Sequence, residues 1–94
     1  MKLEYIEYVA NIEKYHSINK AAKEMFFSQP FLSGVLKSLE DELGYALFVR
    51  NNRGVELTEE GKEFLRLGRQ VQQLVFQMEQ IGSKGKKQVL LSHS

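Results

Sequence analysis

The 94-residue sequence contains no cysteine, no tryptophan, one proline and two histidines. Without cysteine the chain can form no disulfide bond, no thiolate zinc site and no cysteine nucleophile. The two histidines, His16 and His93, are too far apart in the sequence to indicate a metal site, so we expect no cofactor. No apolar run approaches the roughly 20 residues that a membrane-spanning helix needs. The first residues do not resemble a signal peptide, and we therefore expect a cytoplasmic protein without membrane contact.

The sequence also has no excess of one charge sign, because it contains 13 Lys and Arg residues and 12 Asp and Glu residues. The formal net charge of +1 excludes a histone-like polycation, and 43% hydrophobic residues exclude a disordered chain. The charges are nevertheless segregated along the chain. Residues 17–38 hold three lysines and one glutamate, and residues 50–54 hold two arginines. Together these segments could form a face for an anion such as DNA phosphate, although clusters of this size are common on neutral proteins.

Catalytic motifs are missing as well. The sequence has no glycine-rich phosphate-binding loop, no dinucleotide-binding fingerprint, no zinc-protease helix and no nucleophile elbow. The acidic residues at 40–42 and 59–60 could in principle act as acid and base, but they stand at predicted helix ends without any sign of a pocket. Solvated carboxylates are the better interpretation, and the sequence predicts a protein that is not an enzyme.

Apolar spacing and capping residues predict three helices in the first half of the chain. The first has an apolar stripe that begins at Leu3. Ser17 and Ser28 are suited to cap the second and third helices, Pro30 fits a first helical turn, and Gly44 can end the third helix. The expected helices cover residues 3–15, 17 to about 27, and 28–43.

The pattern then changes to two short β-prone runs at 46–49 and 55–58, separated by a polar tip at 50–54 that predicts a β-hairpin. Thr58 can cap a long helix of about 24 residues. Apolar residues recur along this helix at spacings of three and four: Phe64, Leu67, Val71, Leu74, Met78 and Ile81. Such a seam is too long for the small domain to cover alone, so we expect it to pair with a second copy.

The end of the chain has a different composition. Residues 83–94 begin as a glycine-containing basic linker and end, at 88–94, in a β-prone run with no local partner. The family resemblance described next implies that this run is the first strand of a further, effector-binding domain that the chain does not contain.

Five fragments of the sequence, taken together, resemble one family. They are SINKAAKEM at 17–25, SQPFLS at 28–33, LEDELG at 39–44, LFVR at 47–50 and LTEEG at 57–61. In order and spacing they resemble the amino-terminal DNA-binding domain of the LysR-type transcriptional regulators, over about residues 3–65. The resemblance implies a mainly α fold, with a winged helix-turn-helix at 1–58 and a linker and dimerisation helix at 59–82.

The resemblance also implies double-stranded DNA as the partner, with the third helix entering the major groove. The residues expected to contact DNA are Ser17, Asn19, Lys20, Ser28, Gln29, Pro30, Ser33, Gly34, Lys37, Arg50 and Arg53. Gln29 can form a bidentate pair with adenine, and Ser33 can donate to or accept from a base. Ser28 and the N–H groups of the first turn can hold a phosphate. Lys37 is placed to touch the DNA backbone, and Arg53 to reach the minor groove.

Two positions leave alternatives open. Arg50 matches a strongly marked arginine of the family, and it either contacts phosphate or pairs with an acid such as Glu40 to hold the wing. Gly34 stands where family members often carry arginine. Either direct readout is poorer at this position, or the backbone packs closer to DNA.

The expected function is sequence-specific binding of promoter DNA by a homodimer that regulates transcription. In the parent protein a small-molecule effector would act through the missing domain, and a higher oligomer is open for the full-length protein. The alternative is a winged-helix module whose third helix and hairpin bind protein and have no affinity for DNA.

Overall fold

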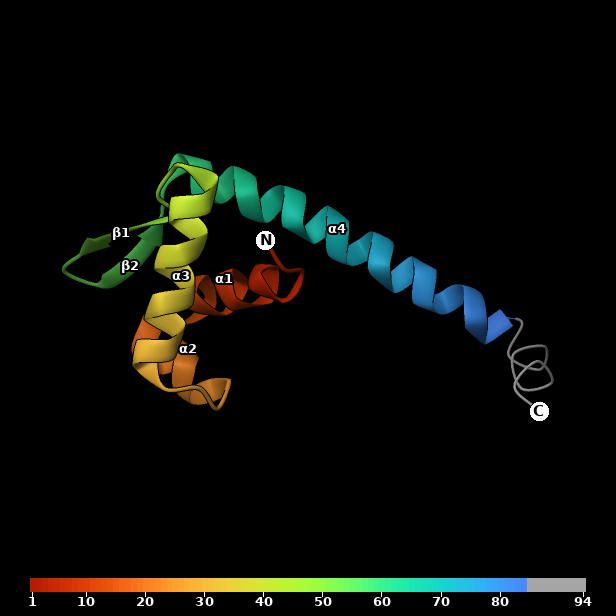
Figure 1. Cartoon of the computed structure of the whole chain (residues 1–94), viewed down its shortest axis with the longest axis horizontal. Helices are drawn as coiled ribbons and strands as arrows, with labels where there is room; N and C mark the ends of the chain where they lie inside the picture. Colours follow the sequence, from red (N-terminus) through yellow and green to blue (C-terminus); the bar gives the residue numbers. More distant parts are fainter. Residues whose placement is uncertain (85–94) are drawn as a thin grey trace.

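The computed structural model describes residues 1–84 and shows four helices and one antiparallel pair of strands in that range (Figure 1). The elements are α1 (Glu4–Tyr15), α2 (Ile18–Glu24), α3 (Gln29–Leu43), β1 (Phe48–Asn51), β2 (Gly54–Leu57) and α4 (Glu59–Lys84). The first three helices and the hairpin form a head from which α4 projects as a rod. This order confirms the predicted winged helix-turn-helix with a long helix after it. The strand predicted at 88–94 lies outside the described residues.

Hydrogen bonds at the helix ends confirm the predicted caps. The hydroxyl oxygens of Ser17 and Ser28 each accept a bond from the backbone N–H three residues later, at 3.0 and 3.2 Å. Thr58 Oγ1 does the same for the first turn of α4 at 2.8 Å. At the other end of α3, Gly44 adopts a left-handed φ of 85° and its N–H donates to the carbonyl of Glu40.

Three boundaries differ from the prediction. Helix α2 ends at Glu24, because Phe26 takes a left-handed φ of 62° that no helix can continue. Both strands lie nearer the tip of the hairpin than predicted, and the tip itself is a turn at 52–53. The carbonyls of residues 46 and 47 are not part of the strand pairing, because they accept bonds from Thr58 at the start of α4. Helix α4 continues to Lys84, and within its last turn the hydroxyl of Ser83 donates to the carbonyl of Gln80 at 2.8 Å.

The core lies where the three helices, the hairpin and the first turns of α4 meet. Its buried residues are Ile6, Val9, Ile12, Ile18, Ala21, Ala22, Leu32, Leu36, Leu39, Leu47, Phe48, Val55, Phe64 and Leu65. The sequence predicts Leu3 on the buried stripe of the first helix, but Leu3 precedes the first residue of α1 and is 59% exposed. Helix α1 instead buries Ile6, Val9 and Ile12, which lie three residues apart.

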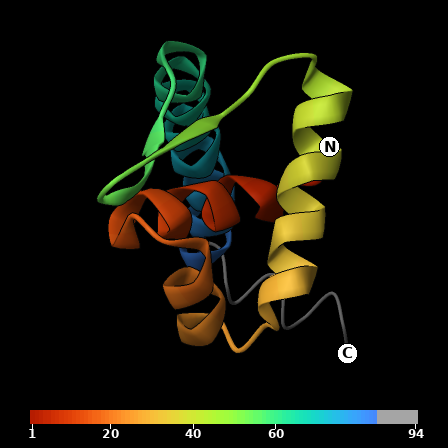
Figure 2. The same ribbon diagram turned by 90° about the vertical axis from the view of Figure 1, so that its left-hand side faces the viewer.

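The hairpin is held against the end of α1. Viewed from the hairpin side (Figure 2), the two strands lie next to the turn that joins α1 to α2. In this turn the carbonyl of His16 accepts the N–H of Val55 at 3.1 Å, and its ring nitrogen Nδ1 lies 3.3 Å from the carbonyl of Val55. His16 is thus a turn residue that ties the hairpin to the end of α1. No helix within residues 1–84 is both long enough and apolar enough to cross a lipid bilayer.

We predict that Gly54→Ala destabilises the fold. Gly54 has a φ of 124°, and a Cβ at this position would lie 2.1 Å from the carbonyl oxygen of His16. Backbone strain and this contact together should lower the free energy of unfolding by at least about 2 kcal/mol. Gly34→Ala is the matched control, because an added methyl group on this helical glycine would have nothing within 4 Å and should gain about 1 kcal/mol of helix propensity. Urea unfolding followed by circular dichroism measures both changes, and an unaltered Gly54→Ala variant would contradict the close approach.

Candidate nucleic-acid interface

The outward side of α3 is formed by the residues that the sequence assigns to it. Gln29, Pro30, Gly34 and Lys37 are exposed and Ser33 is half-buried, while the opposite side of the helix is buried in the core. The ammonium group of Lys37 lies 3.9 Å from the carboxylate of an exposed aspartate one turn later, Asp41. An exposed pair at this distance contributes little to stability, so Lys37 remains available to an external anion.

A polar groove of about 440 Å³ joins α3 to two other elements. Its walls come from the start of α2 with Ser17 and Asn19, the start of α3 with Gln29, and the hairpin with Arg50. The structure therefore brings predicted contact residues from three separate sequence segments to one surface. A surface of this kind offers hydroxyl, amide and guanidinium groups, which are the groups that bind phosphates and base edges.

Arg50 lies on the hairpin face that is turned toward the helices. It pairs in register with the buried Val55 and follows the buried Phe48 by two residues, so all three side chains share one side of the sheet. Arg50 makes no ion pair with any residue in the range 1–84. Of the two roles open to it, the pairing with Glu40 is not formed, and Arg50 is among the residues that line the groove.

Glu40 holds the wing in a different way. One carboxylate oxygen, Oε2, accepts hydrogen bonds from the backbone N–H groups of Leu47 and Phe48, at 2.6 and 3.3 Å. These two N–H groups belong to the segment that enters β1, and the residues that carry them are buried. The negative charge on α3 thus fixes where the wing begins, and it does so through the backbone.

The wing tip is ordered by Asn51, a residue that the sequence reasoning did not single out. Its side-chain oxygen accepts the backbone N–H of Arg53 at 2.8 Å, and its side-chain nitrogen donates to the carboxylate of Glu56 on the other strand. Asparagine before a tight turn commonly makes such a bond, which is the signal in the sequence that could have identified it. Arg53 is consequently held at the outermost point of the hairpin.

Two lysines lie close to the ring of Tyr15, beside the start of α2. The ammonium groups of Lys14 and Lys20 lie 5.3 and 5.9 Å from the centre of the Tyr15 ring, within the range of a cation–π interaction. The sequence predicts a DNA contact for Lys20 but not for Lys14. The structure adds Lys14 to the positive charge on this side, since the turn at His16 brings the end of α1 next to α2.

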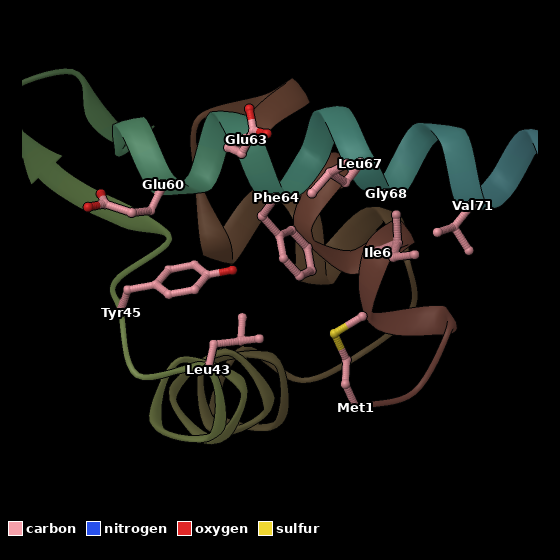
Figure 3. Close-up of a pocket in the computed structure, with 10 residues that line it drawn as sticks. All are labelled: Met1, Ile6, Leu43, Tyr45, Glu60, Glu63, Phe64, Leu67, Gly68 and Val71. Carbon is pink, nitrogen blue, oxygen red and sulfur yellow. The ribbon is translucent and has the colours of Figure 1, made fainter.

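The predicted seam of α4 divides into a buried and an exposed part. Leu67, Val71, Leu74, Met78 and Ile81 are 36–71% exposed, whereas Phe64 is only 8% exposed. Figure 3 shows Phe64 pointing from α4 into the space between Ile6, Leu43 and Tyr45 of its own domain. The expectation that Phe64 belongs to the exposed seam therefore does not hold in the single chain, because the first turns of α4 pack on the head.

An apolar groove of about 390 Å³ lies at this junction, next to the exposed seam. Leu67 and Val71 form its α4 side, and Glu63 stands among the residues that line it (Figure 3). The guanidinium of Arg66 donates hydrogen bonds to the carboxylate of Glu63 and so lowers the pKa of that group. Phe76, 54% exposed, lies on α4 beside the start of α1, away from the seam, and is a further apolar residue that the heptad pattern missed.

These features define a winged helix-turn-helix domain with an exposed apolar helix attached to it. Residues 3–62 match the family described as bacterial regulatory helix-turn-helix protein, lysR family. Because this match covers more than half of the chain, the chain belongs to the LysR family.

Relatives with known names support the same assignment. Over 64 residues the chain is 45% identical to the HTH-type transcriptional regulator BudR of Klebsiella aerogenes, which covers 68% of this chain and 45% of BudR. Over 70 residues it is 37% identical to the RuBisCO operon transcriptional regulator of Allochromatium vinosum, covering 74% of this chain and 23% of that protein. The chain thus spans less than half the length of these regulators.

Solved structures agree with the fold. The crystal structure of the BenM_DBD/benA site 1 DNA complex superposes with a TM-score of 0.82 at 32% identity, covering 89% of this chain and 98% of that chain. The structure of the CbnR_DBD–DNA complex gives a TM-score of 0.82 at 28% identity, covering 92% and 99%. Both matched chains are DNA-binding domains of nearly the same extent as the chain described above.

We predict that Glu40→Ala destabilises the domain although Glu40 makes no ion pair with Arg50. The substitution leaves two backbone N–H groups without their acceptor, which should lower the free energy of unfolding by about 1–3 kcal/mol. Asp41→Ala, the neighbouring position on α3, is the control and should change stability by less than about 0.5 kcal/mol. Thermal and urea unfolding compare the two variants. Equal stability of both would show that the contact between Glu40 and the wing contributes nothing.

Proposed function

We propose that this domain binds double-stranded DNA in a sequence-specific manner, with α3 in the major groove and the wing tip in the adjacent minor groove. The observation that carries the proposal is the single groove that Asn19, Gln29 and Arg50 line from three different elements. BenM_DBD and CbnR_DBD, which share this fold, were both solved as DNA complexes. None of the relatives and solved structures named above is described as a module that binds only protein, which is the alternative.

The proposed contacts follow from the geometry of the site. The hydroxyl of Ser28 and the backbone N–H of Gln29 bind a phosphate at the start of α3. Pro30 has no N–H, and the N–H of Phe31 already donates to Ser28 Oγ. Gln29 then reads a base edge, while Lys37 and Arg50 bind the DNA backbone. Arg53 at the wing tip enters the minor groove, where a narrow A·T segment attracts a guanidinium.

We predict that Arg50→Ala and Gln29→Ala weaken DNA binding in different ways. Arg50→Ala removes a phosphate contact, so affinity should fall on all sequences and the slope of log affinity against log salt should decrease by about 1. Gln29→Ala should cost about 1–3 kcal/mol at one base pair only. Fluorescence anisotropy on a duplex selected from a random pool, and on its scrambled form, measures both effects.

The same titrations contain the outcomes that oppose the proposal. If Gln29→Ala loses the same affinity for the selected and the scrambled duplex, Gln29 does not read a base. A wild-type domain that binds no duplex even at low salt would favour the protein-binding alternative.

We further propose that α4 pairs two copies of the chain. Helix α1 covers one side of α4, where a Cβ on Gly68 would lie 2.7 Å from Ile6 and where Gln72 donates to Glu7 at 3.0 Å. The adjoining side, with the apolar residues Leu74, Met78 and Ile81, stays exposed. Pairing would bury this side and place two recognition helices on one DNA molecule, which suits a site with dyad symmetry.

We predict that Leu74→Glu breaks this pairing. The substitution puts a charge at the centre of the exposed apolar side, so the dissociation constant of the dimer should rise at least about tenfold. Gln73→Glu adds the same charge one residue earlier, on a polar side of α4, and should leave the dimer intact. Sedimentation velocity at micromolar concentration distinguishes the species. A wild-type chain that sediments only as a monomer would overturn the proposed pairing.

For the longer protein to which such a domain belongs, we propose regulation of transcription from the cytoplasm, where the DNA of a bacterium lies. The relatives described above are named as transcriptional regulators, and this chain covers less than half of each. We also propose that the longer protein responds to a small-molecule effector, through residues outside this chain.

A further inference from the structure

One hydrogen bond on the recognition helix joins the two side chains that the sequence predicts to read bases independently. The side-chain nitrogen Nε2 of Gln29 donates to Oγ of Ser33 at 2.5 Å. The residues are four apart on α3, so they lie one turn from each other on the same side of the helix. Within residues 1–84, Ser33 is the one hydrogen-bond partner of the Gln29 side chain. The bond therefore decides where the carboxamide points before any ligand arrives.

The bond also decides which donors of Gln29 remain. A glutamine carboxamide has two N–H donors on its nitrogen and one carbonyl acceptor. Donation to Ser33 occupies one N–H and leaves the other N–H together with the carbonyl oxygen. Adenine presents a donor at N6 and an acceptor at N7 in the major groove, which is the complement of this remaining pair. Guanine presents two acceptors, N7 and O6, and the remaining group can satisfy only one of them.

We propose that Ser33 is a positioning residue that orients Gln29 to accept adenine and reject guanine. The proposal rests on the proposed function and deepens it, because it assigns specificity to the contact between two residues of the reading helix. A free glutamine side chain is flexible, and the conformational entropy that it loses when DNA binding fixes it opposes association. Holding the carboxamide in the free domain removes part of that opposing entropy for adenine, whereas Gln29 must leave Ser33 to donate to both acceptors of guanine.

Gly34 leaves this arrangement undisturbed. Nothing lies within 4 Å of the point where a Cβ of Gly34 would stand, and no longer side chain at that position competes for the carboxamide. The absence of a side chain at 34, beside Ser33, is consistent with readout concentrated in the pair formed by Gln29 and Ser33.

The test is a comparison of base preferences. Wild type and Gln29→Ala are each used to select duplexes from a random pool, and the base pair whose preference disappears in Gln29→Ala is the one that Gln29 reads. Duplexes with adenine or guanine at that position are then titrated with wild type, Ser33→Ala, Ser33→Thr, Gln29→Ala and the double variant. Thermal unfolding of each variant confirms that the domain is folded.

The expected result is specific to the base pair of Gln29. Ser33→Ala should lower the preference for adenine over guanine at least about fivefold, with an unchanged salt slope. Ser33→Thr keeps the hydroxyl and should restore the preference. In the Gln29→Ala background, the further change Ser33→Ala should have no effect on the preference, because Ser33 acts through Gln29.

Two outcomes would overturn the inference while leaving the proposed function intact. The first is a base other than adenine at the position of Gln29. The second is an effect of Ser33→Ala that is equal on all duplexes or that persists without Gln29, since Ser33 would then contact DNA directly. If the wild-type domain selects no sequence at all, the proposed function fails first, and the two failures are thus distinguishable.

Discussion

The carboxylate of Glu40 and the backbone N–H groups of Leu47 and Phe48 form the contact on which the geometry of the head depends. The contact joins the recognition helix to the first residues of the wing, and the bond between His16 and Val55 ties the far strand to the end of α1. With both ends of the hairpin fixed, the wing cannot turn independently of α3. The helix that reads bases and the wing that binds phosphate or the minor groove then form one rigid surface.

Electrostatics explain how a chain with a net charge of +1 can present a site for a polyanion. Lys20, Lys37, Arg50 and Arg53 lie on α2, the outward side of α3 and the hairpin, whereas two of the acids form contacts within the domain. Glu40 is occupied by backbone N–H groups, and Glu63 by the guanidinium of Arg66. Total charge is therefore a poor guide to nucleic-acid binding in so small a domain, and the distribution of charge over the surface decides.

Two adjoining sides of α4 have different roles: one packs on the head, and the other is exposed and available to an external partner. Its first turns complete the core through Phe64 and Leu65, and one side runs along α1 where Gly68 permits close approach. The apolar side that begins at Leu67 remains uncovered. A regular heptad pattern cannot distinguish these uses, because Phe64 and Leu67 have the same chemistry and differ only in whether α1 and the end of α3 lie over them.

The sequence by itself determined the order of the elements, the serine and threonine caps, the glycine that ends α3 and the family. These features depend on residues within a turn or two of each other, which local spacing records directly. Only the tertiary structure decided that Phe64 is buried, that Glu40 binds the backbone of the wing instead of Arg50, and that Asn51 orders the tip. Each of these outcomes depends on which groups the folded chain places opposite one another. The bond between Gln29 and Ser33 depends on both levels. The spacing of four residues on a helix allows it, and the conformations of the two side chains in the folded domain form it.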